Sequence, residues 1–344
     1  MTKRKHHIKT KTINLALQGG GSHGAYTWGA LDRLLEENKL EIEGISGASA
    51  GAMNAIALAS GFAKNGRDGA MAELARMWKH ISNEGLFSPI QRTPFDMLLK
   101  NWSLKFSPSY LATDILGRLM SPYQTNPLGV NPLRIMLHGM IDFEAVKACQ
   151  QIKLFISATS VRTGKPRFFR RNEINADVLA ASSCLPTLYQ SVIIDGEAYW
   201  DGGYMGNPMI WPLIYECNAR DVVLIQVNPI TRDEVPRTAP EINNRINEIA
   251  FNASLVSEMR AMDFVARLLD EGVLDPKKYK KMLMHRIHSE GKMDQLDASS
   301  KVNAEWEFLK YLHKTGYNAA DNWLRAHWSQ VGEKSSLDIR ANYL

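Results

Sequence analysis

Two short glycine-rich segments near the start of the chain have the residue types for acyl-group chemistry. Residues 47–51 read Gly-Ala-Ser-Ala-Gly, and residues 19–24 read Gly-Gly-Gly-Ser-His-Gly. A serine in a G-x-S-x-G turn stands on a sharp bend between a strand and a helix, and small neighbours let these elements approach closely. Free backbone amides in a glycine loop can bind the oxyanion that forms when serine attacks an acyl carbonyl. The two segments therefore predict a nucleophile, Ser49, and an oxyanion hole made by Gly20, Gly21 and Ser22.

A serine nucleophile needs a base, and the best candidate in the chain is Asp201. This residue directly follows a short β-rich run, Glu197 to Trp200, and precedes Gly202 and Gly203, which permit a tight turn. A triad in the chain order Ser, acid, His would instead require a histidine late in the sequence. The late histidines are all expected in amphipathic helices, which is a poor position for a base: His285, His288, His313 and His327.

The first glycine loop also allows a competing interpretation. Gly19, Gly21 and Gly24 have the G-x-G-x-x-G spacing of a dinucleotide-binding loop, and Glu41 or Glu43 lies about 20 residues downstream, where an acid would bind the ribose. Such a fold needs a second strand that ends in this acid, whereas Glu43 leads directly into the serine turn. A nicotinamide-dependent enzyme stays open as an alternative function.

The segments around these residues predict an α/β fold. Ile13 to Gln18 and Glu43 to Ser46 are short strand candidates, and each leads through a glycine-containing turn into a helical pattern. Two successive units of this kind indicate a mostly parallel central sheet flanked by helices, with functional loops at the carboxyl ends of the strands. Later strands are expected at Lys153 to Ser160, Pro166 to Arg170, Val192 to Ile194, Glu197 to Trp200 and Asp221 to Val227.

Two further regions are expected to surround this sheet. Prolines recur between residues 86 and 131, so that region is predicted to form a peripheral wall or lid without long unbroken helices. Beyond residue 240, apolar residues such as Ile242, Ile246 and Ile249 recur at helical spacing. We expect these stripes to pack on the core as a helical C-terminal extension over residues 236–344.

The composition limits the class of protein. The chain has 41 Lys and Arg against 36 Asp and Glu, and five of the basic residues lie in the first eleven positions. Residues 1–12 are therefore expected to be a flexible basic tail, or a contact for anionic lipid, on a neutral body. We find no signal peptide, no transmembrane helix and no metal-ligand cluster, and the three cysteines are widely spaced. A reduced, cytoplasmic protein without a metal or other cofactor is expected, and nucleic acid is not an expected partner.

Together, the three glycine motifs resemble those of the patatin-like phospholipase family. Residues 19–24 after a strand, 47–51 as an elbow and Asp201-Gly202-Gly203 follow that family's order and spacing over residues 13–230, and Ala181 to Pro186 resembles its small-residue block. The resemblance implies a three-layer α/β/α domain over residues 13–235 and a Ser49–Asp201 dyad without a catalytic histidine. Gly19, His23, Gly24, Gly47, Gly51, Gly202 and Gly203 are then supporting motif residues. His23 departs from the Arg or Lys that many relatives carry there.

The resemblance implies a serine acyl hydrolase that acts on lipid esters as a phospholipase A or lysophospholipase. The same residues are compatible with an acyltransferase that uses this dyad and with a catalytically silent lipid-binding module. The partner is then an acyl lipid, with peripheral membrane contact, while the oligomeric state, headgroup and chain length are left open by the sequence.

Overall fold

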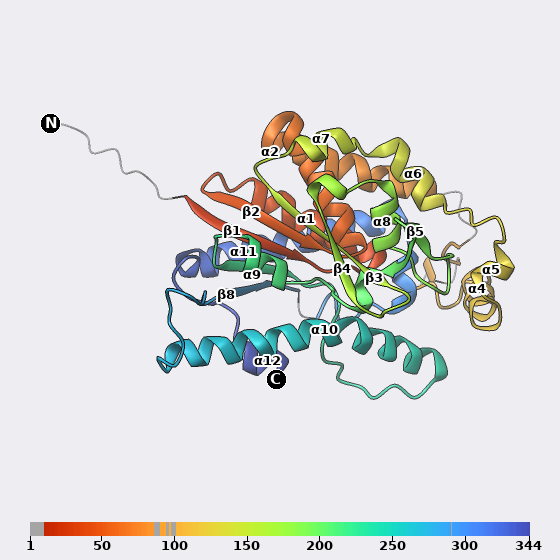
Figure 1. Ribbon diagram of the computed structural model, residues 1–344. Helices are drawn as coiled ribbons and strands as arrows, with labels where there is room; N and C mark the ends of the chain where they lie inside the picture. The colour runs from red at the N-terminus through yellow and green to blue at the C-terminus, as the bar shows by residue number, and fades with distance from the viewer. Residues whose placement is uncertain (1–9, 86–89, 94–95, 98–100, 290) are drawn as a thin grey trace.

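The core of the protein is an eight-stranded sheet in which five adjacent strands run parallel (Figure 1). The computed structural model describes residues 10–85, 90–93, 96–97, 101–289 and 291–344. The strand order is β5-β6-β3-β2-β1-β7-β8, with β4 paired to β3; β4 and β6 run antiparallel to β3, and β5 runs antiparallel to β6. The strands are β1 (Lys11–Leu17), β2 (Leu40–Gly47), β3 (Lys153–Ser160), β4 (Pro166–Arg170), β5 (Val192–Ile194), β6 (Glu197–Asp201), β7 (Asp221–Ile225) and β8 (Leu283–Ile287).

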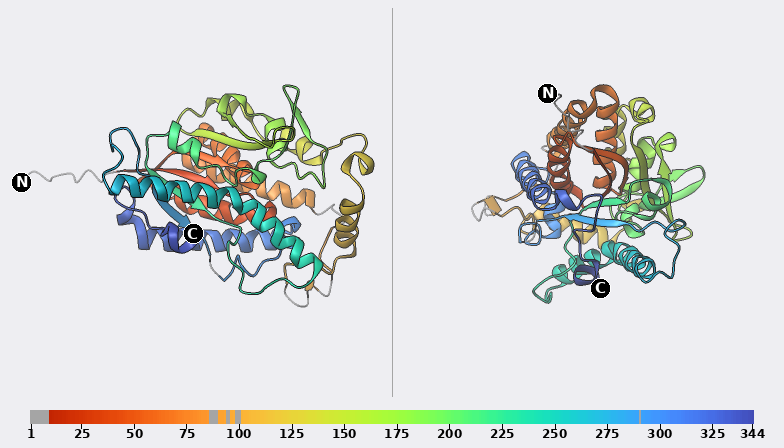
Figure 2. Two further views of the ribbon diagram at one scale, coloured as in Figure 1. Left: turned by 60° about the horizontal axis from the view of Figure 1, so that its bottom comes forward. Right: turned by 90° about the vertical axis from the view of Figure 1, so that its left-hand side faces the viewer.

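Helices cover both faces of this sheet (Figure 2). Leu15 and Leu17 of β1 face a core shared with α1, α2 and α11, whereas Ala16 between them faces a second core shared with α9, α10 and α12. The larger helices are α1 (Gly24–Leu35), α2 (Ala50–Gly85), α4 (Pro108–Leu119), α6 (Pro132–Met140), α8 (Ala176–Ser182), α10 (Ala239–Asp270) and α11 (Trp306–His327). The shorter ones are α5 (Pro122–Thr125), α7 (Phe143–Ala148), α9 (Trp211–Glu216) and α12 (Ile339–Tyr343). The expected three-layer α/β/α architecture with C-terminal helices is confirmed.

Helices α1 and α11 pack so closely that each has a glycine at the contact. A Cβ atom on Gly29 would lie 1.8 Å from the carbonyl oxygen of His313, and one on Gly316 would lie 1.9 Å from that of Tyr26. Only glycine leaves space for the two backbones to approach this far. Helix α11 thereby fixes α1, the helix that follows the first glycine loop.

The segment after residue 235 is not only helical, because it supplies strand β8 to the sheet. The prediction that His285 and His288 lie in amphipathic helices is therefore wrong: His285 lies within β8, and His288 follows directly after it. The run from Leu283 to Ile287 is short and contains a histidine and an arginine. The sheet tolerates these polar residues because His285 bonds to Asp221 on the adjacent strand.

The first part of α10 also differs from the sequence-based expectation. The stripe of Ile242, Ile246 and Ile249 was expected to pack on the core, but these side chains are 42%, 56% and 54% exposed. The core contact of α10 begins further along the helix, at Leu255 and Met259, which are fully buried. The apolar stripe is therefore real, but its first two turns face outward.

The remaining expectations concern the N-terminus and the membrane. Most of the expected tail, residues 1–9, lies outside the described residues, and Lys11 and Thr12 already belong to β1. The Lys11 ammonium donates to the carbonyl oxygens of Trp328 and Val331 at 2.6 and 2.7 Å. In the part of the chain that the structure describes, none of the helices has the length and apolar character to cross a bilayer.

Candidate active site

Ser49 stands on a strained turn between β2 and α2. Its φ of 53° lies in the left-handed region, which non-glycine residues rarely adopt. The turn is possible because its neighbours are small: a Cβ on Gly47 would lie 2.8 Å from the Ala52 nitrogen, and one on Gly51 would lie 2.2 Å from the carbonyl oxygen of Leu17. The predicted strand-turn-helix geometry around the serine is therefore present, and backbone strain of this kind is typical of functional sites.

The Ser49 hydroxyl forms a hydrogen bond with the carboxylate of Asp201. Asp201 is the last residue of β6 and is only 1% exposed. Burial raises the pKa of its carboxyl to about 7, although hydrogen bonds from the Gly203 amide and from Ser49 oppose this effect. A buried carboxylate with one bond to a serine hydroxyl is suited to accept a proton, because its basicity is far above that of an exposed aspartate.

The two glycines after Asp201 are needed to hold this carboxylate. The Gly203 amide donates to Asp201 Oδ1 at 2.7 Å, and a Cβ on Gly203 would lie 2.4 Å from the ring of Phe251 on α10. A Cβ on Gly202 would lie 2.2 Å from the carbonyl oxygen of Ser157. The Asp201 amide donates to the carbonyl oxygen of Cys184, so the block at residues 181–186 also positions the aspartate.

The first glycine loop lies directly against the serine turn. A Cβ on Gly19 would come within 2.7 Å of Ser49 Cβ and 2.6 Å of the Ala48 carbonyl oxygen. Gly21 has a φ of 59°, and Gly24 packs so tightly on Ala50 that a Cβ there would lie 2.7 Å from the alanine methyl group. Within the described residues, the Gly20 amide has no hydrogen-bond partner. The loop therefore packs against Ser49 through Gly19, and the free N–H group of the predicted oxyanion hole belongs to the next residue.

Polar residues that the sequence analysis did not single out hold these loops. Asn207 Oδ1 accepts from the Gly19 amide at 2.7 Å, and Asn228 Nδ2 donates to the Gly19 carbonyl oxygen at 2.7 Å. Ser182 Oγ accepts from the Ser49 amide at 3.0 Å. Asn228 could have been found by its place after β7, at the carboxyl edge of the sheet, and Ser182 by its place in the 181–186 block. No sequence signal pointed to Asn207.

The His23 side chain bonds to the C-terminal segment and not to Ser49 or Asp201. It is 2% exposed, and its Nε2 bonds to Ser300 Oγ at 2.8 Å. Burial lowers its pKa well below the usual range, and the cations of Lys301 and Arg232 lower it further. His23 is thus a neutral ring that fixes the loop to the C-terminal segment.

Three of the four late histidines bond elsewhere as well, and the fourth, His327, lies beside Trp323 at the end of α11. His285 Nε2 bonds to Asp221 and His313 Nε2 to Asp32, at 2.9 and 2.8 Å. His288 bonds to the Gln226 carbonyl oxygen and to Asp294. These contacts leave Asp201 as the titratable group bonded to Ser49.

The acid needed for dinucleotide binding is not at the glycine loop. Glu43 lies within β2, and its carboxylate accepts from the amides of Asn218 and Ala219, which precede β7. That contact is at the amino edge of the sheet, whereas the glycine loop is at the carboxyl edge. Glu41 lies two residues earlier in β2, beside Thr12 at the start of β1. Neither acid lies at the glycine loop, and the geometry disfavours the nicotinamide-dependent function.

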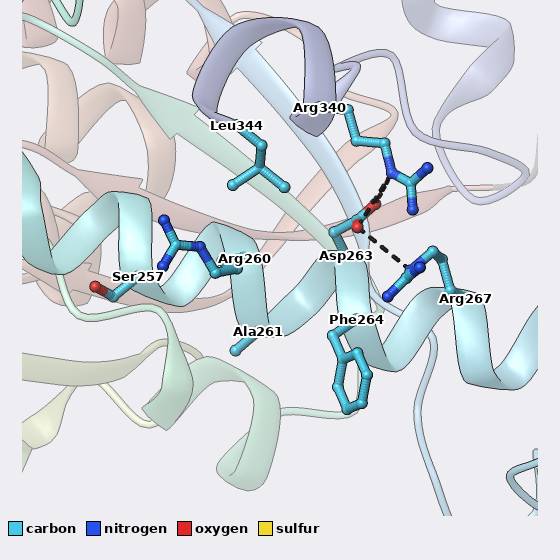
Figure 3. Close-up of a pocket in the computed structure, with 8 residues that line it drawn as sticks. All are labelled: Ser257, Arg260, Ala261, Asp263, Phe264, Arg267, Arg340 and Leu344. Atoms are coloured by element: carbon cyan, nitrogen blue, oxygen red, sulfur yellow. Dashed lines mark hydrogen bonds and ion pairs between the residues drawn. The ribbon is translucent and has the colours of Figure 1, made fainter.

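A separate groove of about 850 Å³ lies between α10 and α12, where Arg340 and Arg267 pair with Asp263 at 3.0 and 3.7 Å (Figure 3). It contains no residue of the serine turn, the glycine loop or the β6 end, so it is not part of the candidate active site. The residues that the structure describes also contain no group of three or more His, Cys, Asp or Glu arranged to hold a metal ion.

Comparisons with known proteins agree with the motifs. The family described as patatin-like phospholipase matches residues 15–214, which is more than half of the chain, and the chain belongs to this family. Twelve chains of solved structures also match. VipD from Legionella pneumophila is 16% identical with a TM-score of 0.38, over 93% of this chain and 67% of VipD.

The type III effector ExoU is 15% identical with a TM-score of 0.32, over 92% of this chain and 53% of ExoU. This chain thus spans about two thirds of the length of VipD and about half that of ExoU. No curated protein sequence matches the chain.

Proposed function

We propose that this protein hydrolyses acyl esters of lipids, as a phospholipase A or lysophospholipase, with Ser49 as nucleophile and Asp201 as general base. The hydrogen bond between the Ser49 hydroxyl and the buried Asp201 carboxylate carries this proposal. Membership of the family supports a lipid ester hydrolase in general. The roles of Ser49 and Asp201 and the type of ester go beyond family membership and are our proposal.

The proposed cycle follows from this geometry. Asp201 accepts the hydroxyl proton as Ser49 Oγ attacks the ester carbonyl. The proposed oxyanion hole, made by the amides of Gly20, Gly21 and Ser22, receives the negative charge on the carbonyl oxygen. The tetrahedral intermediate then expels the alcohol, which takes the proton from Asp201, and the acyl group stays on Ser49. In the second half, Asp201 accepts a proton from water as the water oxygen attacks the acyl-enzyme. The tetrahedral intermediate then expels Ser49 Oγ, which takes the proton back from Asp201, and the fatty acid is released.

Exposed apolar side chains near the site support access to lipid at a surface. Leu119 is 77% exposed, Leu128 88% and Ile135 66%, and on α10 the Ile242, Ile246 and Ile249 side chains also face outward. We call the exposed apolar side chains of residues 111–135 and 235–249 the apolar rim. Figure 1 shows α4, α5 and the start of α10 at the end of the molecule toward which the parallel strands run.

The segments that carry the apolar rim contact residues near the dyad in the sequence. Tyr123 bonds to Ser191 and Gln190 bonds to the carbonyl oxygen of Asn126, at 2.9 and 2.7 Å, in the segment that follows the 181–186 block. On the other side, Phe251 of α10 packs against Gly203. Soluble proteins rarely leave so many large apolar side chains exposed together, and such patches mark contact surfaces. We therefore infer a peripheral contact with a lipid surface through the apolar rim.

The experiment that tests the proposed function is labelling with a fluorophosphonate, which reacts with activated serines. We expect the wild-type protein to be labelled at Ser49 and to hydrolyse p-nitrophenyl butyrate and phospholipid. Ser49→Ala should lose both reactions while its melting temperature stays near that of the wild type. Asp201→Asn should lose hydrolysis in the same way.

An unlabelled wild-type protein, or a fully active Asp201→Asn variant, would refute the dyad. Added alcohol acceptors would reveal acyl transfer by the appearance of new esters.

A further inference from the structure

His23, in the glycine loop, is a buried neutral ring whose pKa lies well below the usual range. The structure brings a cation to the same loop from a distant part of the sequence. Lys301 lies in the 3-10 turn Ala298–Val302, far beyond the matched residues 15–214. Its backbone presses on the loop, since a Cβ on Gly21 would lie 2.3 Å from the Lys301 carbonyl oxygen and 3.4 Å from Lys301 Cβ.

The Lys301 side chain reaches the loop through one asparagine. The ammonium donates to Asn228 Oδ1 at 2.8 Å, and Nδ2 of the same amide donates to the carbonyl oxygen of Gly19 at 2.7 Å. That carbonyl and the N–H of Gly20 belong to one peptide group. The peptide is trans, so its N–H points away from its carbonyl oxygen, on the side opposite Asn228.

We propose that Lys301 and Asn228 form a hydrogen-bond relay that polarises the Gly19–Gly20 peptide and strengthens its N–H as an oxyanion donor. The chain runs from ammonium to side-chain amide to peptide, and each bond increases the dipole of the next group in a water-poor environment. No proton moves along the relay. Lys301 and Asn228 are positioning residues, because they act on the reacting oxygen only through the Gly20 amide. The proposal rests on the proposed function of Ser49.

The surroundings of Lys301 keep the ammonium in place. Burial lowers the pKa of Lys301, the Glu248 carboxylate raises it in part, and Arg232 lowers it further. Arg232 itself pairs with Glu248, and Arg245 pairs with the same carboxylate at 3.1 Å. Next to Lys301, Ser300 Oγ bonds to His23 at 2.8 Å. The turn therefore holds the glycine loop at two points, one neutral and one cationic.

The test uses the full chain with p-nitrophenyl butyrate, a soluble ester. The variants are Lys301→Met, Lys301→Arg, Asn228→Ala and the double variant Lys301→Met/Asn228→Ala. Lys280→Met is the matched control, because its ammonium also donates to backbone carbonyls, those of Ile214 and Cys217, at the amino edge of the sheet. End-point labelling of Ser49 measures the amount of competent protein, and thermal melts followed by circular dichroism check that each variant is folded.

We expect Lys301→Met to lower kcat about 10-fold with an unchanged KM, less than the loss of a whole oxyanion donor. Lys301→Arg should recover most of this loss, and Lys280→Met should behave as wild type. The double variant should be no slower than Asn228→Ala, because the two residues act in one chain. A normal kcat in Lys301→Met, a raised KM instead of a lowered kcat, or additive losses would overturn the relay alone. A wild-type protein that is neither labelled nor active would overturn the proposed function, and the relay with it.

Discussion

Ser49 and Asp201 meet although strand β3 lies between the strands that carry them. The sheet register accounts for this contact. Gly47 pairs with Ile156 of β3, and Asp201 pairs with Ala158 of the same strand. Ser49 lies two residues beyond Gly47, and Ala158 lies two residues beyond Ile156. Serine and aspartate are therefore at the same level along the strand direction, at the carboxyl edge of the sheet. The dyad geometry is thus a property of β-strand pairing as well as of the two turns.

We predict that ester hydrolysis rises with pH through about 7. Burial raises the pKa of Asp201 to about 7, and the proposed base acts only when it is deprotonated. The kcat/KM for p-nitrophenyl butyrate should therefore be low at pH 5 and reach a plateau above pH 8. Hydrolysis that is already maximal at pH 5 would mean that Asp201 is not the base.

We predict that Asp201→Asn stabilises the protein at alkaline pH. The Asp201 pKa is higher in the folded than in the unfolded chain, so its contribution to stability is present at low pH and lost as the pH rises through about 7. Asparagine removes this buried charge and can still accept the Gly203 bond. The variant should be more stable than wild type by about 2–4 kcal/mol at pH 8.5.

The gap between the two melting curves should shrink toward pH 5. Glu258 also has a pKa raised to about 7, but it titrates in both proteins and cancels in the comparison. A difference in stability that does not change with pH would contradict this prediction.

We predict that Gly316→Ala destabilises the fold without a direct effect on the site. The added methyl group would lie 1.9 Å from the Tyr26 carbonyl oxygen and force α11 away from α1, at a cost of about 1–3 kcal/mol in the free energy of unfolding. Gly139→Ala is the control, because nothing lies within 4 Å of its Cβ position and alanine favours helix by about 0.5–1 kcal/mol. Urea unfolding curves measure both. Equal midpoints for the two variants would show that α1 and α11 can separate freely.

We predict that charges in the apolar rim weaken binding to lipid vesicles. Leu119→Asp and Ile246→Asp should each reduce co-sedimentation with vesicles of phosphatidylcholine and phosphatidylglycerol about 10-fold. Each substitution removes a large apolar side chain that would be buried in the lipid layer. Hydrolysis of soluble p-nitrophenyl butyrate should stay the same. Val273→Asp is the control, since Val273 is 65% exposed but lies beyond the other end of α10. Unchanged binding by both rim variants would remove the apolar rim from lipid contact.

The sequence predicted those parts of the molecule whose signals are local. The strands at Lys153–Ser160 and Pro166–Arg170 have the predicted bounds, and the turn between β5 and β6 uses Asp195 and Gly196, both with positive φ, as a hairpin requires. Strand β8 was missed because its neighbour, β7, lies almost sixty residues earlier. A histidine in a short strand gains its partner, Asp221, only through that long-range pairing.

The supports of the candidate site were harder to predict for the same reason. Ser49 and the glycine loops have strict local spacing, whereas Asn207 and Lys301 bind the loop from far along the chain. The outward-facing stripe of α10 shows a different limit of sequence-based prediction. Periodicity in Ile242, Ile246 and Ile249 reveals that a face is apolar, but it does not say whether protein or another phase covers that face.

The place of β7 in the sheet has a practical consequence for fragments of this chain. Strand β1 pairs with β2 on one side and with β7 on the other, and β7 lies after residue 214, where the family match ends. A fragment cut at that boundary would leave the apolar edge of β1 open to pairing with other molecules. We expect such a fragment to aggregate, so the region that defines the family by sequence is smaller than the region that can fold.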